Sequence, residues 1–145
     1  MNILFLTIGN LKSVEEPGIY SDLLREFSQQ GHTVTIMSPL EKRLNMRTQF
    51  EQHHNVSYLK VKIGNITKTN LVEKGISTLL IESQFLTALK QYLNDVRFDL
   101  IMYSTPPITF EKVIKYIKKR DGAKSYLLLK DIFPQNAVDL NMFSE

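Results

Sequence analysis

The sequence predicts an α/β fold: a three-layer, Rossmann-like domain with a mostly parallel sheet of about five strands. Three observations predict it. Short apolar runs typical of strands alternate with segments whose apolar residues recur at helical spacing. A chain of 145 residues is about the length of one domain. The unbroken apolar run 126–129 is typical of a strand buried on both faces, as a parallel sheet covered by helices requires.

The first third of the chain predicts a right-handed βαβ unit. An apolar run over 2–8 ends at the turn signal Gly9-Asn10, and a second strand is expected over 33–37. Between them, Gly31 ends a segment with one apolar stripe. The members of that stripe, spaced i, i+3, i+4 and i+7, are Tyr20, Leu23, Leu24 and Phe27.

The middle third predicts one strand and the longest helix. Pro39 is expected to close the second strand, and the polar, basic segment 40–55 has no period and is expected to be loop. A third strand is expected over 56–63, a turn-rich stretch over 64–70 and a helix over about 76–93. The apolar positions expected to form its buried stripe are Leu79, Ile81, Phe85, Leu86, Leu89, Tyr92 and Leu93.

The last third repeats the alternation. A fourth strand over 98–103 is broken by the proline-containing segment 104–107, and Gly122 ends the helix that follows. The fifth strand is 126–129, and 135–142 is expected to begin another helix. The apolar stripe of the third helix consists of Phe110, Val113, Ile114 and Ile117.

The expected strand order, 3-2-1-4-5, puts the first and fourth strands side by side at a topological switch point. Gly9 and Asn10 and the 104–107 loop would then flank one crevice at the carboxyl edge of the sheet. Lys130 and Asp131 directly follow the fifth strand, so Asp131 would close that crevice. An equally open alternative is a surface carboxylate that pairs with Lys130 or caps the next helix.

Several classes of site are disfavoured. The loop after the first strand has one glycine where a dinucleotide fingerprint requires three, and no Walker motif is present, so no NAD, FAD or other cofactor is expected. There are no cysteines, and the adjacent His53 and His54 should lie on opposite sides of an extended chain without a third ligand, so no metal is expected. The net charge of +3 is mild, and nucleic acid is not expected as a partner.

Two further features have a functional and a structural interpretation. Gly18 precedes the first helix, where backbone N–H groups could face a ligand oxygen, or it simply forms a loop-to-helix turn. Lys42, Arg43 and Arg47 are either solvated or contact anionic lipid or pyrophosphate head groups. No stretch approaches the ~20 apolar residues of a membrane span, so membrane contact is expected to be peripheral.

Four motifs in the same order resemble the amino-terminal half of GT-B glycosyltransferases, in particular the family-4 type that acts in bacterial capsule, O-antigen and exopolysaccharide synthesis. The most specific is Lys-Asp-Ile-Phe-Pro-Gln, which looks like the Asp-Leu-Trp-Pro-Glu-Ser segment of these enzymes. Where they often have Gly-Gly before the first helix, this chain has Pro17-Gly18. The four motifs occupy 17–20, 31–36, 104–107 and 130–135.

The resemblance implies two facing Rossmann domains, the first binding the acceptor and the second holding the nucleotide sugar. Residues 1–145 correspond to the first alone, and the carboxyl-terminal donor domain is missing from them. By resemblance, Asp131 would line the reaction centre as the catalytic residue. The other implied positions, which would bind the acceptor or border the diphosphate, are Gly9, Asn10, Gly18, Ser104, Thr105 and Lys130.

The implied activity of the complete protein is transfer of a hexosyl group from a nucleotide sugar to a saccharide, lipid-linked in the expected case. Transfer would take place in the cytoplasm, with contact to the inner face of the membrane, and this chain by itself is expected to be inactive. Two alternatives stay open. One is a non-catalytic subunit or scaffold of a split glycosyltransferase, and the other is a flavodoxin-like module that binds a small ligand.

Overall fold

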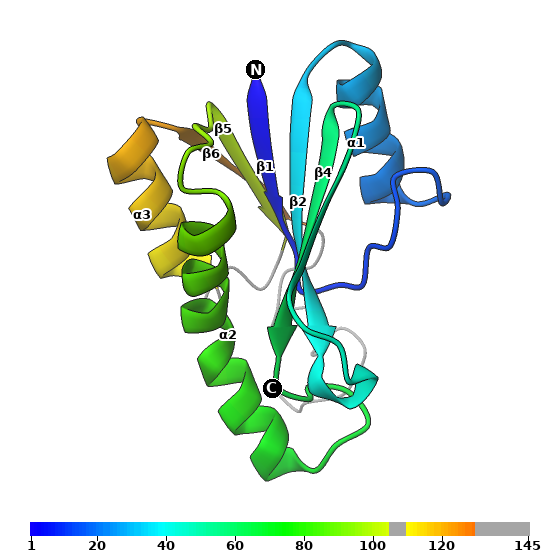
Figure 1. The fold of residues 1–145 in the computed structure, drawn as a ribbon, viewed down its shortest axis with the longest axis vertical. Coiled ribbons are helices and arrows are strands. Elements are labelled where there is room, and N and C mark those ends of the chain that lie inside the picture. The colour runs from blue at the N-terminus through cyan, green and yellow to red at the C-terminus, as the bar shows by residue number, and fades with distance from the viewer. Residues whose placement is uncertain (105–109, 130–145) are drawn as a thin grey trace, which may run out of the picture.

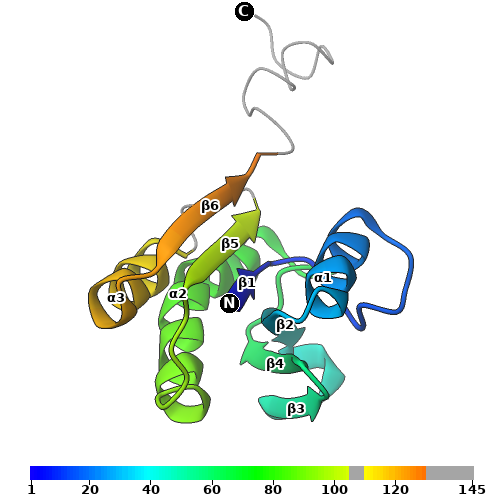
Figure 2. The same ribbon diagram turned by 90° about the horizontal axis from the view of Figure 1, so that it is seen from above.

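The computed structural model describes residues 1–104 and 110–129 of the chain. It is an α/β sandwich of three layers, with a six-stranded sheet between α1 on one face and α2 and α3 on the other (Figure 2). Figure 1 shows the elements, which in chain order are β1 (Asn2–Leu6), α1 (Ile19–Gln29), β2 (Thr33–Glu41), the 3₁₀ helix η1 (Lys42–Leu44), β3 (Gln49–His53), β4 (Val56–Ile63), α2 (Leu71–Tyr92), β5 (Leu100–Ser104), α3 (Glu111–Asp121) and β6 (Lys124–Leu128).

The sheet order is β3-β4-β2-β1-β5-β6. Every neighbouring pair is parallel except β3 and β4, which pair antiparallel. The predicted order of five parallel strands is therefore confirmed, and β3 is an additional edge strand. The expectation of loop over 40–55 is wrong, because this segment holds η1 and β3. The two residues His54 and Asn55 connect β3 to β4, and His54 adopts the left-handed backbone conformation (φ 52°).

Two apolar clusters fill the space on either side of the sheet. On the α1 side, Leu24 packs with Phe5 and Ile36, and the predicted stripe of α1 is confirmed. On the other side, α2 and α3 pack on the sheet, with the rings of Phe85 and Phe110 5.2 Å apart. β1 is buried on both faces, as expected for the central strand of a parallel sheet.

Two boundaries differ from the predictions. β2 continues through Pro39 because β1 has ended by that point: its last partner in β2 is Met37, so one side of β2 is free of a neighbour there. α2 begins at Leu71 rather than near 76, after Asn70 has capped it by accepting the N–H of Glu73 (2.8 Å).

Two predicted core positions, Leu79 and Tyr92 (36% exposed), and one predicted strand are more exposed than expected. Leu79 is 82% exposed, whereas Ile81, Phe85 and Leu89 of the same helix are buried. β6 was expected to be buried on both faces, but Tyr126 is 57% exposed. β6 is an edge strand of the sheet described by the structure, which explains why its apolar side chains are less covered than those of β1.

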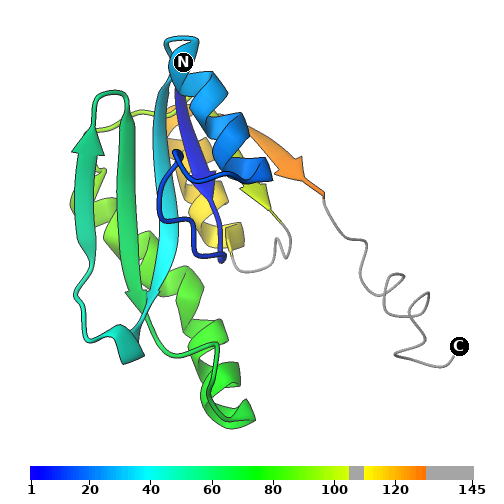
Figure 3. The same cartoon turned by 90° about the vertical axis from the view of Figure 1, so that its right-hand side faces the viewer.

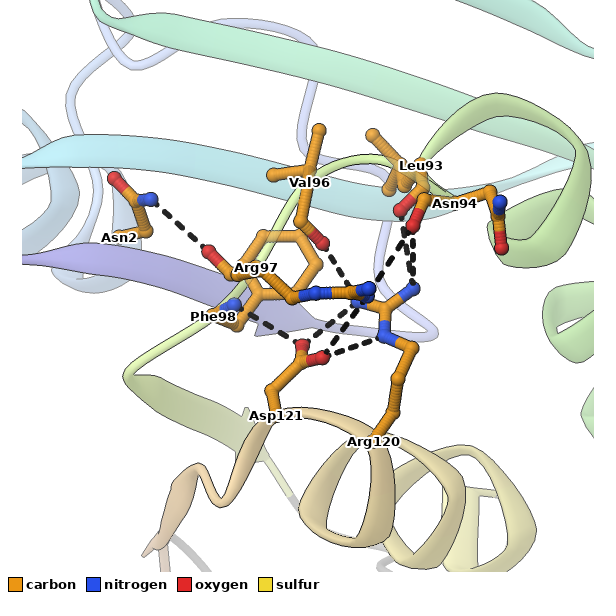
Figure 4. A network of polar contacts seen from close by, with 8 residues as sticks. All are labelled: Asn2, Leu93, Asn94, Val96, Arg97, Phe98, Arg120 and Asp121. Carbon is orange, nitrogen blue, oxygen red and sulfur yellow. Dashed lines mark hydrogen bonds and ion pairs between the residues drawn. The ribbon is translucent and has the colours of Figure 1, made fainter.

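A network of polar contacts fixes the end of α3 at the amino edge of the sheet (Figure 4). Asp121 accepts hydrogen bonds from Arg120, Arg97 and the N–H of Phe98, and its side chain is fully buried. Arg120 also donates to the carbonyl oxygens that follow α2, including that of Val96 (2.7 Å). Gly122 then ends α3 in the left-handed conformation (φ 71°), as predicted. The network joins α3 to the connection between α2 and β5.

The opposite, carboxyl edge of the sheet is where the loops after the parallel strands emerge. The β1–α1 loop, η1 and the loop over 64–70 all follow the carboxyl ends of strands. In Figure 1, η1 and the loop over 64–70 lie toward the bottom, and the β1–α1 loop lies at mid-height on the right. The first turns of α2 extend past the ends of the strands (Figures 1 and 3). Ligands of open α/β sheets bind outside this edge, so it is the part of the fold to search for a site.

Candidate functional site at the carboxyl edge of the sheet

The loop that follows β1 and the start of α1 enclose a hollow of about 240 Å³. The structure brings together three of the residues predicted from sequence, Gly9, Asn10 and Gly18, around this hollow. They come from opposite ends of the β1–α1 loop. The other lining residues are Thr7, Leu11, Lys12, Glu16, Pro17, Ile19, Tyr20 and Ser21.

The β1 side of the hollow is a tight turn. The N–H of Gly9 donates to Oγ1 of Thr7 (2.9 Å), and the N–H of Leu11 donates to the carbonyl oxygen of Gly9 (3.1 Å). A Cβ atom added at Gly9 would lie 3.3 Å from Oγ1 of Thr7, a closer contact than most side chains make. Because Gly9 has no side chain, no atoms project from this side into the hollow, and the backbone of Gly9 stays accessible to a ligand.

The α1 side is the amino terminus of a helix. Gly18 occupies the N-cap position and has no side chain to accept the first N–H groups, so these retain bonding capacity for a ligand. The carbonyl oxygen of Gly18 accepts the N–H of Asp22 (2.8 Å), which begins the helical ladder. N–H groups of the first turn, together with the helix dipole, favour an oxygen that carries negative charge.

The charges around the hollow are mixed, and the loop itself is anchored. Lys12 and Glu16 both line the hollow. Arg25 of α1 donates to the carbonyl oxygen of Val14 (2.6 Å), and the hydroxyl of Tyr58 in β4 accepts the N–H of Val14 (3.1 Å). These two contacts hold the middle of the loop against α1 and the sheet, so that its two ends keep their relative positions.

The remaining residues predicted from sequence are placed differently. Ser104 ends β5 opposite Leu128, is buried, and does not line the hollow. Thr105, Lys130 and Asp131 lie outside the described residues. The predicted crevice can therefore be described only on its β1–α1 side.

Sequence reasoning did not select four polar residues that line the hollow, namely Thr7, Lys12, Glu16 and Ser21. A signal was present for Thr7, which is the first polar residue after a buried strand and therefore stands at the carboxyl edge. Lys12, Glu16 and Ser21 gave no comparable signal, because only the folded loop brings them to the same hollow.

A second hollow, of about 570 Å³, lies between α1, the β1–α1 loop and the β3–β4 hairpin. Both His53 and His54 line it. The extended chain expected at this pair is not found at His54, which adopts the left-handed backbone conformation (φ 52°). Within residues 1–104 and 110–129, no group of three or more histidine, cysteine or acidic side chains is placed to hold a metal ion.

Asp99, at the amino edge of the sheet, has a structural role. Its Oδ2 atom accepts the N–H of Asn2 (2.6 Å) and so fixes the start of β1. In the part of the chain that the structure describes, no helix has both the length and the apolar character to span a bilayer.

Comparison with known proteins identifies the fold. No protein-family model matches the chain, and no curated protein sequence matches it. A solved structure does: trehalose-6-phosphate synthase from E. coli bound to UDP-2-fluoroglucose, a glycosyltransferase of GT-B fold. The TM-score is 0.57 over 91% of this chain, at 8% sequence identity. The chain has a fold of the GT-B glycosyltransferase type and spans about a third (34%) of the length of that structure.

Proposed function

We propose that this chain is the acceptor-binding, amino-terminal half of a glycosyltransferase that moves a sugar from a nucleotide-sugar donor to a saccharide. The observation that carries the proposal is the combination of a GT-B type sheet with a hollow at the carboxyl end of its central strand, open to the first turn of α1. The similar E. coli structure holds a UDP-sugar analogue, which supports a nucleotide sugar as the partner.

The hollow is suited to a diphosphate oxygen. The free N–H groups at the start of α1 and the ammonium group of Lys12 supply positive potential, and Gly9 and Asn10 present backbone close to it. During transfer, the bond between the anomeric carbon and the diphosphate breaks as the bond to the acceptor oxygen forms, and negative charge builds up on the departing diphosphate. Donors already fixed in position stabilise that charge without reorganising.

The acceptor side of the cleft is assigned to the residues that follow β5 and β6. Asp131 would hydrogen-bond sugar hydroxyls or steer the acceptor, and Thr105 and Lys130 would contact acceptor hydroxyls and phosphate. Ser104 is the least suited of the group, since its side chain is buried beneath the edge. Correct placement of the acceptor oxygen supplies much of the rate in such a reaction.

The wider role follows from the same proposal. The donor-binding half would face this domain across the cleft, and the acceptor would be a lipid-linked saccharide in the synthesis of bacterial cell-surface polysaccharide at the inner face of the membrane. A single Rossmann-like half supplies only one wall of the cleft, so we expect no sugar transfer by residues 1–145 without the donor half.

Binding of a diphosphate to the hollow is tested by two-dimensional ¹⁵N NMR of the chain titrated with UDP, pyrophosphate or uridine. We expect UDP and pyrophosphate at millimolar concentration to shift the amide signals of Gly9, Asn10 and Ile19, because these line the hollow. Uridine lacks the phosphates and should leave these amide signals unshifted. Lys12→Ala should weaken the effect of both phosphate ligands by about 5- to 10-fold, as expected for loss of one charge-assisted hydrogen bond.

The matched control is Lys119→Ala on α3, which removes an exposed lysine remote from the hollow and should change nothing. Shifts confined to His53 and Asn55 would assign the ligand to the second hollow instead. An absence of shifts with every ligand would contradict the proposed diphosphate site.

A further inference from the structure

The first half of α2 has an apolar face that no described part of the chain covers. Its four residues, which we call the α2 apolar face, are Val72, Ile76, Leu79 and Leu80. Val72 is 73% exposed, Ile76 57% and Leu79 82%. Single exposed apolar residues are ordinary, but a contiguous group on one helix marks an interaction surface.

The position of this face follows from helix geometry. Ser77, Ile81 and Phe85 are buried against the rest of the fold, and residues three and four apart share a side of a helix. Val72, Ile76 and Leu79 repeat at the same spacing on the opposite side. The first half of α2 is therefore apolar on both sides. It also extends past the carboxyl ends of the strands, at the bottom of Figures 1 and 3.

A polar network ties this part of α2 to η1 and the 64–70 loop. Asn65 accepts the N–H of Arg43 (2.9 Å) and donates to Glu73 (2.9 Å). Thr69 also donates to Glu73, and Arg43 donates to Glu41 (3.1 Å). We call Glu41 at the end of β2, η1, this loop and the first half of α2 the tip. Because its parts are hydrogen-bonded to one another, the tip presents one surface rather than three independent segments.

The tip is basic. Its two carboxylates, Glu41 and Glu73, accept hydrogen bonds from neighbouring residues: those from Thr69 and Asn65 lower the pKa of Glu73. Burial alone would raise the pKa of Glu41, but hydrogen bonds from Thr67 and Arg43 outweigh it and lower that pKa. Both are therefore ionised and paired within the tip. The exposed basic residues of the tip and of the segment that follows η1 are Lys42, Arg43, Arg47, Lys68 and Lys74. Of these, Lys74 lies on the same side of α2 as Ser77 and Ile81, away from the α2 apolar face.

We propose that the tip is a docking surface for an anionic lipid bilayer, with the α2 apolar face entering the boundary between head groups and acyl chains. Apolar side chains flanked by lysine and arginine are the combination that binds such an interface, since the former gain by burial and the latter by attraction to lipid phosphate. Leu44 and Met46, 47% and 41% exposed, add apolar surface beside the basic residues.

The charge of the tip favours this partner over a second copy of the chain. Two copies joined through the α2 apolar face would bring the basic residues of both tips together, which costs free energy. A bilayer that contains phosphatidylglycerol presents the complementary charge. The inference does not rest on the proposed sugar transfer, because it depends only on the apolar and basic surface of the tip.

The test uses a reporter that the chain makes possible, because the sequence contains no tryptophan. In Leu79→Trp the new indole stands on the α2 apolar face. We expect its emission to shift to shorter wavelength on addition of vesicles of phosphatidylcholine with 30% phosphatidylglycerol, and to be quenched by brominated acyl chains. In the matched control Tyr126→Trp, on β6, where Tyr126 is 57% exposed, no shift is expected.

Two pairs of substitutions then separate the contribution of charge to vesicle binding from that of the apolar side chains. Binding of each variant is measured by vesicle co-sedimentation. Lys42→Glu with Lys68→Glu should weaken binding at least about 30-fold, given ~1 kcal/mol per basic residue near an anionic surface. Val72→Ser with Ile76→Ser should weaken it about 10-fold or more. The matched charge control, Lys118→Glu with Lys119→Glu on α3, should leave binding within about 3-fold. Raising the salt concentration should also weaken binding.

Several outcomes would overturn the proposal. One is no binding of the unsubstituted chain to vesicles that contain phosphatidylglycerol. A second is equal binding of the tip variants and the α3 control. A third is a dimer in sedimentation velocity that the Val72→Ser and Ile76→Ser pair dissociates, which would assign the α2 apolar face to self-association.

Discussion

Gly64, between β4 and α2, is a position where the lack of a side chain determines packing. A Cβ atom added there would lie 2.2 Å from Oγ of Ser77 and 2.8 Å from its Cβ, both closer than real atoms approach. Ser77 belongs to the buried side of α2. The close packing of Gly64 against Ser77 therefore sets how closely the first half of α2, and with it the tip, can approach the sheet.

Gly64→Ala should lower the free energy of unfolding by about 1–3 kcal/mol, the usual cost of overpacking. Ser77→Gly removes the atoms that clash, so the double variant should lose less than the sum of the two single variants. Chemical denaturation of all four proteins gives this coupling. Gly75→Ala is the control: nothing lies within 4 Å of its added Cβ, and a helical alanine should stabilise by about 0.5–1 kcal/mol. Additive effects of Gly64→Ala and Ser77→Gly would contradict the packing argument.

At the scale of the element, α3 is held to the rest of the fold by the buried carboxylate of Asp121. Burial alone would raise the pKa of this group, but the hydrogen bonds from Arg120 and the N–H of Phe98, with the charges of Arg120 and Arg97, outweigh it and lower the pKa. Asp121 in turn raises the pKa of Arg120. The carboxylate of Asp121 and the guanidinium of Arg120 thus each offset the free-energy cost of burying the other's charge.

Asp121→Asn should destabilise the protein by about 3 kcal/mol at neutral pH, because it leaves the guanidinium of Arg120 without its counter-charge. Urea denaturation measures the loss, and hydrogen exchange should show it first in α3 and in the connection from α2 to β5. Asp95→Asn, an exposed aspartate that follows α2, is the control and should cost no more than about 0.5 kcal/mol. Equal effects of the two substitutions would mean that the network contributes little.

At the scale of the whole molecule, four carboxylates distributed over the fold have lowered pKa values: Glu41 and Glu73 in the tip, Glu111 in α3 and Asp121 at its end. A group whose pKa is lower in the folded state stabilises the fold above its unfolded pKa. That contribution is lost as the pH falls through the folded value. Acid should therefore weaken both edges of the sheet together.

We expect the free energy of unfolding to be nearly constant from about pH 7 to 5 and to fall steadily below about pH 4.5, where unfolded carboxylates begin to bind protons. Urea denaturation at several pH values between 7 and 2.5 measures this. In Asp121→Asn one of the four groups no longer titrates, so its stability should decline less over the same range. Parallel curves for the two proteins would exclude Asp121 as a contributor.

The order of the parallel strands was predictable because burial imposes a strong pattern on them. β1 is apolar at nearly every position, and the glycines Gly31 and Gly122 mark the ends of the helices before β2 and β6. Right-handed crossovers then leave few possible strand orders. β3 was not predictable in this way. Its residues 49–53 are mostly polar and exposed, and it exists through pairing with β4 and a turn that contains neither glycine nor proline.

The exposure of Leu79 and the composition of the hollow also depend on the folded chain. In a helix that is apolar on both sides, periodicity cannot say which side is buried, and packing on the sheet decides it. Topology was sufficient to expect Gly9 and Asn10 at the carboxyl edge, and the structure places Gly18 beside them. The contribution of Lys12 depends on the path of the β1–α1 loop. The binding roles of all these residues stay predictions.

The polar network of Figure 4 lies at the amino edge of the sheet, and the proposed diphosphate hollow and the tip lie at the other. The length of the strands separates them, and sites this far apart usually contribute independently to the free energy. Robustness and recognition can therefore be engineered separately in this fold. A variant stabilised around Asp121 should keep the hollow and the tip unchanged. Destabilising substitutions near Gly9 or Val72 could then be assayed in that variant on a folded protein.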